Sequence, residues 1–119
     1  MKNNTNSDNE YTTVEKKLTD FENTCVAQDA LKTITGKWKI SIIKIIAAQC
    51  PKRFGILKRD LDHIAQGTLT TVLRELEQDG ILAREAFAEI PPRVEYKLTA
   101  KGIKLLPILV ELEQWYQSE

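Results

Sequence analysis

The chain has 119 residues, of which 42% are hydrophobic and 29% are charged, and its formal net charge at pH 7 is zero. This is the composition of one ordinary globular domain, and the apolar runs fall short of the ~18–20 residues that a membrane-spanning helix needs. The N-terminus also lacks the apolar core of a signal peptide, so the sequence excludes a membrane protein and predicts a cytoplasmic one.

The N-terminal residues predict a tail followed by a helix. Residues 1–11 are polar and rich in asparagine, so we expect a flexible tail there and a single folded domain over residues 12–119. Val14, Leu18 and Phe21 then recur at the spacing i, i+4, i+7 of a short amphipathic helix. Its apolar stripe is narrow and requires a neighbour to cover it.

Two further helices are predicted before residue 50. The first spans residues 25–35 and ends before Gly36. Its apolar residues are expected to face inward; they are Val26, Ala30, Leu31 and Ile34. The second spans residues 38–48 and is apolar nearly all round, which only a central core helix tolerates.

A helix-turn-helix is predicted over about residues 52–79, with helices at 52–61 and 65–80. The second helix has an apolar face with i, i+3, i+4, i+7 spacing, made of Leu69, Val72, Leu73 and Leu76. Its opposite side is short and polar and suits the polar base edges of a DNA major groove. Taken alone, this pattern favours an ordinary core helix with a solvated face.

A β-hairpin is predicted next, over about residues 81–98. Its strands are residues 81–87 and 94–98, and the tandem prolines Pro91 and Pro92 lie between them, since prolines cannot donate hydrogen bonds to a strand ladder. This arrangement sets Arg93 at the hairpin tip, with Arg84 and Lys97 along the strands.

The last predicted helix covers about residues 100–117. Thr99 is in position to cap its N-terminus, and Pro107 is expected to kink or restart it. The helix carries more apolar side chains than one buried face requires, which indicates a second surface to be covered.

The distribution of charge favours a nucleic-acid partner. Residues 31–104 hold 14 Lys and Arg against 8 Asp and Glu, whereas residues 1–30 hold 3 against 6 and residues 105–119 hold none against 3. A basic middle with acidic ends is expected when the middle of the chain meets phosphates.

The sequence offers no pattern of an enzyme or of a metal protein. Cys25, Cys50 and His63 show no paired ligand spacing, so we expect neither a metal nor a cofactor. There is no nucleophile–base pair and no glycine-rich phosphate loop, so we expect no enzyme. In a cytoplasmic protein the two cysteines are expected to be free thiols.

These elements predict an α+β, mostly helical fold: a winged helix-turn-helix. Five runs in this order resemble the HxlR-type family of bacterial winged-helix transcriptional regulators, which is MarR-like. They are GKWKISII at 36–43, PKRFGIL at 51–57, LTTVLRELEQDGIL at 69–82, PPRVEYKLTAKG at 91–102 and LLPIL at 105–109.

The resemblance implies a homodimeric regulator, expected to be a repressor, that binds palindromic double-stranded operator DNA. The N-terminal segment and the helix at about 100–117 would form the dimer interface. Ala65 and Gly67 depart from the family pattern, which often has a serine and a basic residue at these positions, so the helix start loses a side-chain cap and one expected contact.

The winged-helix mechanism assigns candidate DNA contacts. Recognition helices read bases with their N-terminal residues, narrow minor grooves attract arginine, and flanking helix starts hold phosphates. The candidates are Gln66, Gly67, Thr68, Thr71 and Arg74 on the second helix, Arg93 on the wing, and Lys52 and Arg53 before it.

Two alternatives remain open at this stage. Family members sense oxidants or electrophiles through a cysteine at the position of Cys25, so the resemblance implies a redox sensor there; the other reading is a small, half-buried hydrophobic residue. Cys50 is expected to be unreactive, or to pair with Cys25 of a second subunit. For the whole protein, the alternative to a DNA-binding regulator is a winged-helix module that contacts only other proteins.

Overall fold

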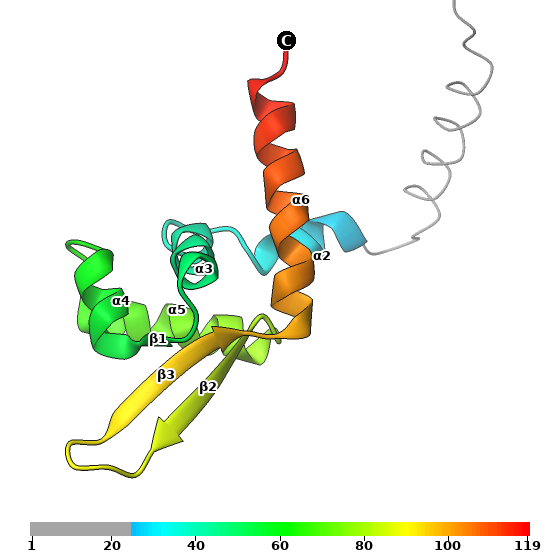
Figure 1. Ribbon diagram of the computed structural model, residues 1–119. Coiled ribbons are helices and arrows are strands. Elements are labelled where there is room, and N and C mark those ends of the chain that lie inside the picture. The colour runs from blue at the N-terminus through cyan, green and yellow to red at the C-terminus, as the bar shows by residue number, and fades with distance from the viewer. Residues whose placement is uncertain (1–24) are drawn as a thin grey trace, which may run out of the picture. The chain divides into compact units, whose positions relative to one another are not determined.

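The computed structural model describes residues 25–119. Residues 25–32 belong to one unit of the chain, and Thr33–Glu119 form a second, compact unit. The first unit contributes one described helix, α2 (Val26–Lys32). The second unit holds the remaining elements (Figure 1), which are α3 (Lys39–Ala48), β1 (Lys52–Arg53), α4 (Phe54–Asp60), α5 (Gln66–Gln78), β2 (Leu82–Phe87), β3 (Arg93–Leu98) and α6 (Ala100–Gln117). The predicted tail and the helix carrying Val14, Leu18 and Phe21 lie outside the described residues.

Helix α2 is shorter than predicted and has no buried residue. Val26 and Leu31 are 52% and 47% exposed, so the expected inward face of this helix is wrong. The helix ends at Lys32, and the buried Ile34 follows it in a turn of the second unit. Ile34 therefore reaches the core from a turn, without a helix to carry it.

The core of the second unit forms around α3, as its apolar composition predicts. Ile42, Ile43 and Ile46 are completely buried. They belong to one cluster with Leu57 of α4 and the apolar face of α5. Burying one such side chain stabilises the fold by about 1.5–3 kcal/mol, so this cluster anchors both α4 and α5 in the core. No helix among the described residues is long and apolar enough to cross a membrane.

The sheet has three antiparallel strands in the order β1-β3-β2, so the predicted hairpin is confirmed and gains a third strand. Lys52 and Arg53, predicted to open a helix, form β1 instead, opposite Tyr96 and Glu95 of β3. Helix α4 therefore begins at Phe54. A strand of two residues is too short for hydrophobic periodicity to show it, which is why the prediction is wrong here.

Helix α6 begins and ends as predicted. Thr99 is its N-cap, and the Thr99 hydroxyl accepts a hydrogen bond of 3.0 Å from the Gly102 N–H. Pro107, which the sequence predicts to kink or restart the helix, lies inside one continuous element. Proline removes the hydrogen bond to the carbonyl four residues earlier and crowds that carbonyl, but the helix continues on both sides, so the predicted restart is wrong.

The start of α6 is fastened to the end of α5. The Thr99 N–H donates to the Ile81 carbonyl at 3.0 Å, and the Thr99 hydroxyl donates to the Gly80 carbonyl. The Lys101 ammonium donates to the Asp79 carbonyl at 3.1 Å. Main-chain carbonyls at the end of α5 thus hold the first turn of α6 in place.

Candidate nucleic-acid interface

Helix α5 has the two faces that the sequence predicts. Leu69, Leu73 and Leu76 are completely buried against the core. The candidate contact residues on this helix are all exposed; they are Gln66, Gly67, Thr68, Thr71 and Arg74. The core therefore holds the helix by one side and presents the polar side to solvent.

The first turn of α5 has open space and no side-chain cap. Its N-cap residue, Ala65, makes no capping hydrogen bond, as the sequence predicts. No atom lies within 4 Å of the place where a Cβ on Gly67 would be, and a shallow hollow in this region is lined by Gly67, Thr68 and Thr71 among others. The main-chain N–H groups of this turn are consequently available to an external acceptor.

The turn between α4 and α5 contains a residue in the left-handed conformation. His63 has φ 72°, whereas Leu61 and Ile64 on either side are buried. This conformation is uncommon for a residue other than glycine, and histidine is among the residue types that adopt it more often. The turn sets the direction of α5 relative to α4, and both of its anchors are in the core.

The two basic residues before α4 have different environments. The Lys52 ammonium is 2.9 Å from the Asp60 carboxylate, and its side chain is only 12% exposed. Arg53 is 62% exposed and lies 3.9 Å from Glu95. Of this pair, Arg53 is the residue with a cation open to a ligand.

The register of the hairpin gives the wing two distinct faces. Arg84 is opposite Tyr96, so these two side chains share the face on which Tyr96 is buried. Arg93 is opposite Phe87 and Glu95 is opposite Glu85, which sets these four side chains on the other face. Residues 82–98 as a whole carry three basic and three acidic side chains, so the wing is neutral.

Arg93 is held within the wing by two carboxylates. Its guanidinium forms ion pairs with Glu89 and, at 2.9 Å, with Glu95, and lies 3.9 Å from the centre of the Phe87 ring. Partial burial lowers the pKa of Arg93, but the hydrogen bond and charge of Glu89, and after them those of Glu95, outweigh it, so the pKa lies above its ordinary value. The arginine predicted to contact DNA from the wing tip is thus already paired within the protein.

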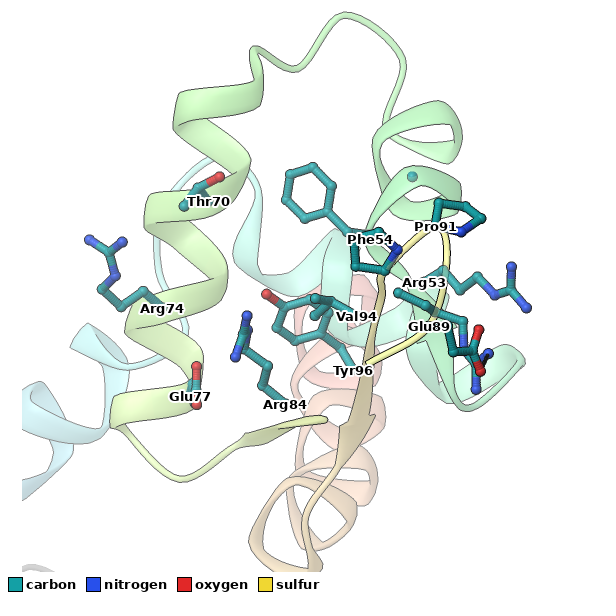
Figure 2. Close-up of a pocket in the computed structure, with 13 residues that line it drawn as sticks. Arg53, Phe54, Thr70, Arg74, Glu77, Arg84, Glu89, Pro91, Val94 and Tyr96 are labelled. Atoms are coloured by element: carbon teal, nitrogen blue, oxygen red, sulfur yellow. Dashed lines mark hydrogen bonds and ion pairs between the residues drawn. The ribbon is translucent and has the colours of Figure 1, made fainter. Parts of the chain in front are cut away.

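A groove runs between α5 and the wing, with a volume of about 770 Å³. Its basic lining residues are Arg53, Arg74, Arg84 and Arg93. Figure 2 shows Arg84 between α5 and Tyr96, whereas Arg53 and Glu89 each lie on the other side of Tyr96 in this view. Among residues 25–119, Arg74 and Arg84 form no ion pair, so the α5 side of the groove carries the unpaired cations.

Sequence reasoning did not select Arg84 as a site residue. The alternation of side chains along the two strands could have pointed to Arg84, because Arg84 pairs with the buried Tyr96 and its side chain lies on the same face of the hairpin. The sequence does not predict that α5 lies beside that face, because the position of α5 depends on tertiary packing.

A second surface, apart from this groove, lies on α6. Large apolar side chains are exposed along it, and Ile108, Leu112 and Trp115 follow the spacing i, i+4, i+7 of one stripe. Their exposed fractions are 57%, 39% and 70%. From residue 110 onward no residue of the chain is buried. This half of α6 is tied to α3 by the 2.9 Å ion pair between Lys44 and Glu113, while its apolar side chains stay exposed.

The two cysteines are exposed free thiols. Cys25 directly precedes α2 in the first unit, and Cys50 follows α3 in the second. The expectation of a half-buried hydrophobic residue at position 25 is therefore wrong.

Comparison with known proteins gives consistent matches. The family model described as HxlR-like helix-turn-helix matches residues 33–119, the range of the second unit. An uncharacterised HTH-type transcriptional regulator of Halalkalibacterium halodurans is 48% identical over 85 residues, which cover 71% of this chain and 75% of the relative.

The solved structures that resemble this chain are also regulators. A MarR-family transcriptional regulator from Enterococcus faecalis V583 matches with a TM-score of 0.72 and 44% identity, covering 83% of this chain and 92% of that one. The redox regulator HypR in its reduced form matches with a TM-score of 0.69 and 40% identity, covering 75% and 87%.

Proposed function

The chain belongs to the HxlR-like helix-turn-helix family of transcriptional regulators, and from this we propose that it is a homodimeric repressor that binds a palindromic DNA operator. The observation that carries the proposal is the polar, exposed face of α5 beside a groove whose unpaired cations are Arg74 and Arg84. A rigidly held helix with such a face fits a major groove, and flanking arginines fit the phosphates beside it.

We assign the proposed DNA contacts to base edges or to phosphates according to the chemistry of each side chain. Gln66, Thr68 and Thr71 would meet base edges, because their amide and hydroxyl groups donate and accept hydrogen bonds. Gly67 would allow the helix backbone to approach closely, and the uncapped N–H groups of this turn would bind phosphate. Arg74 and Arg84, with Arg53 at the far side of the groove, would neutralise the DNA backbone. Lys52 is omitted because Asp60 already holds it.

The dimer is proposed to form through α6. A contiguous stripe of exposed apolar side chains on a single helix is unusual for a monomer, and a second copy would bury it symmetrically. Two copies of α5 would then meet two half-sites, which matches a palindromic operator.

Titration of DNA fragments tests this proposal. We expect the protein to bind one fragment from the region upstream of its own gene in preference to unrelated DNA. Arg74→Ala and Arg84→Ala should each reduce the dependence of log K on log salt by about 0.9 per phosphate contact, or about 1.8 for a dimer. Lys58→Ala is the matched control, since Lys58 is an exposed cation at the end of α4 that does not line the groove.

If no fragment binds in preference to competitor DNA, even at low salt, the proposal is wrong and a protein-interaction module becomes the better interpretation. If binding occurs but the two arginine variants behave as the control does, DNA binds elsewhere on the molecule.

A redox response through Cys25 is proposed in addition, because its thiol is exposed and HypR, a similar protein, is a redox regulator. Diamide would accept two electrons and two protons from the Cys25 thiols of two subunits, which join as an intersubunit disulfide. We expect diamide to release operator DNA from the unmodified protein and from Cys50→Ser, and not from Cys25→Ser. Release from Cys25→Ser at an unchanged diamide concentration would rule out this thiol.

A further inference from the structure

Arg93 and its two carboxylates form a closed unit in the wing, here named the carboxylate clasp: Glu89, Arg93 and Glu95. The Arg93 side chain is 22% exposed and the Glu95 side chain 18% exposed, so this ion pair is largely shielded from water. Glu89 closes the unit from the tip loop, four residues before Arg93. A pair with little access to water is screened less by salt than the exposed pairs of the surface.

The clasp also reaches a second cation. Arg53 of β1 lies 3.9 Å from the same Glu95 oxygen that binds Arg93, because β1 and β3 set these residues opposite each other. Glu95 therefore stands between two arginines that both line the groove. A phosphate that approaches this end of the groove therefore meets the exposed Arg53 together with two carboxylates, while Arg93 is already paired.

We propose that Glu89 and Glu95 occupy Arg93 in place of DNA phosphate, both in the free protein and on DNA, and so keep the affinity of this winged helix below what its arginines would give. Arg93 is then a positioning residue that holds the tip loop against Phe87 rather than a DNA contact. The inference rests on the proposed function, since it concerns the regulation of the same groove.

The alternative is that a DNA phosphate displaces the two carboxylates and forms an ion pair with Arg93. The geometry favours the clasp, because leaving it would strip Arg93 of two charged partners and a ring contact in exchange for one phosphate. It would also leave Glu89 and Glu95 uncompensated close to the DNA backbone, where like charges repel.

The test is a charge-neutral replacement, Glu89→Gln, in the full chain, with binding to a short random-sequence DNA duplex measured between about 50 and 200 mM salt. Glu89 is about half exposed, so this change preserves the fold. We expect affinity at low salt to rise about threefold or more, with a steeper salt dependence. In Glu89→Gln/Glu95→Gln the rise should reach about tenfold or more, and the slope should steepen by about 0.9 for each arginine released.

The matched control is Glu85→Gln. Glu85 lies on the same face of the wing, directly opposite Glu95, and loses the same charge, but it holds no arginine among the described ion pairs. A general effect of charge would raise the affinity of this control equally without steepening its slope. Adding Arg93→Gln to the double variant should remove the part of the gain that comes from Arg93 and lower the slope by about 0.9 per subunit, because that cation is then gone.

The outcomes separate the two ideas. If the unmodified protein binds the duplex and Glu89→Gln equals Glu85→Gln, or binds more weakly than the unmodified protein, the clasp does not oppose binding and the inference is wrong. An Arg93→Gln change that flattens the slope of the unmodified protein by about 0.9 per subunit would overturn it as well. If the unmodified protein binds no DNA at all, the proposed function fails first and the inference with it.

Discussion

Gly102, in the first turn of α6, packs against the backbone of Ile81 so closely that a Cβ on Gly102 would lie 2.4 Å from the Ile81 carbonyl oxygen. The same carbonyl accepts the Thr99 N–H, so it cannot move away without breaking a hydrogen bond. The chain leaves α5 at this place and enters the wing. The contact therefore couples the helix proposed to read DNA to the helix proposed to form the dimer.

Gly102→Ala should destabilise the fold by about 1–3 kcal/mol, the usual cost of forcing extra atoms into a packed site. The atom that the new Cβ would meet is a backbone oxygen and not the end of a flexible side chain, so the clash can be relieved only by moving the backbone. The measurement is the free energy of unfolding in urea. Gly55→Ala is the control, since Gly55 is also helical and no atom lies within 4 Å of the place that its Cβ would take; equal values for the two variants would contradict the prediction.

Thr99→Ala should cost about 1 kcal/mol through the loss of the N-cap, and more if the hydrogen bond to the Gly80 carbonyl contributes separately. Thr99→Ser keeps the hydroxyl and should recover most of that free energy of unfolding. Thermal melting of the three proteins side by side measures the effect. A serine variant as unstable as the alanine variant would mean that the methyl group, not the hydroxyl, is what matters.

The sequence is sufficient to predict a structural element where the residues of that element follow a regular pattern. The spacing of Leu69, Leu73 and Leu76 predicts the buried face of α5, and the prolines between the two strands predict the hairpin. The cap at Thr99 is equally visible. Each of these features depends on residues close together in the chain, and the local physics is enough to determine them.

The features that the sequence does not predict depend on strand pairing and tertiary packing that the local pattern does not reveal. β1 consists of two residues whose strand character comes only from pairing with β3. Arg93 has the pattern of a free cation because its partner Glu95 is two residues away, a spacing that brings side chains together on one face only within a strand. Arg84 gains its place in the groove from α5, which lies beside the wing through packing of the core.

Gly67→Ala should change stability and DNA affinity in opposite directions. The added methyl group has open space around it, and alanine favours the helix over glycine by up to about 1 kcal/mol, so the free energy of unfolding should rise. DNA affinity should fall, because the methyl group would stand where the helix backbone is proposed to approach the bases. No charge is lost, so the salt dependence of binding should not change; an unaltered affinity would exclude Gly67 from the contact.

Ile108→Asp should separate the dimer while leaving the fold of each subunit intact. Ile108 is 57% exposed, so its replacement removes little packing within the subunit, whereas a carboxylate in a buried interface stripe costs at least about 2 kcal/mol, or roughly 30-fold in dissociation constant. Ile90→Asp is the matched control, because Ile90 is a fully exposed isoleucine at the wing tip. Sedimentation equilibrium gives the mass of each protein in solution. A dimer that survives Ile108→Asp at the concentration where the control is dimeric would move the interface away from α6.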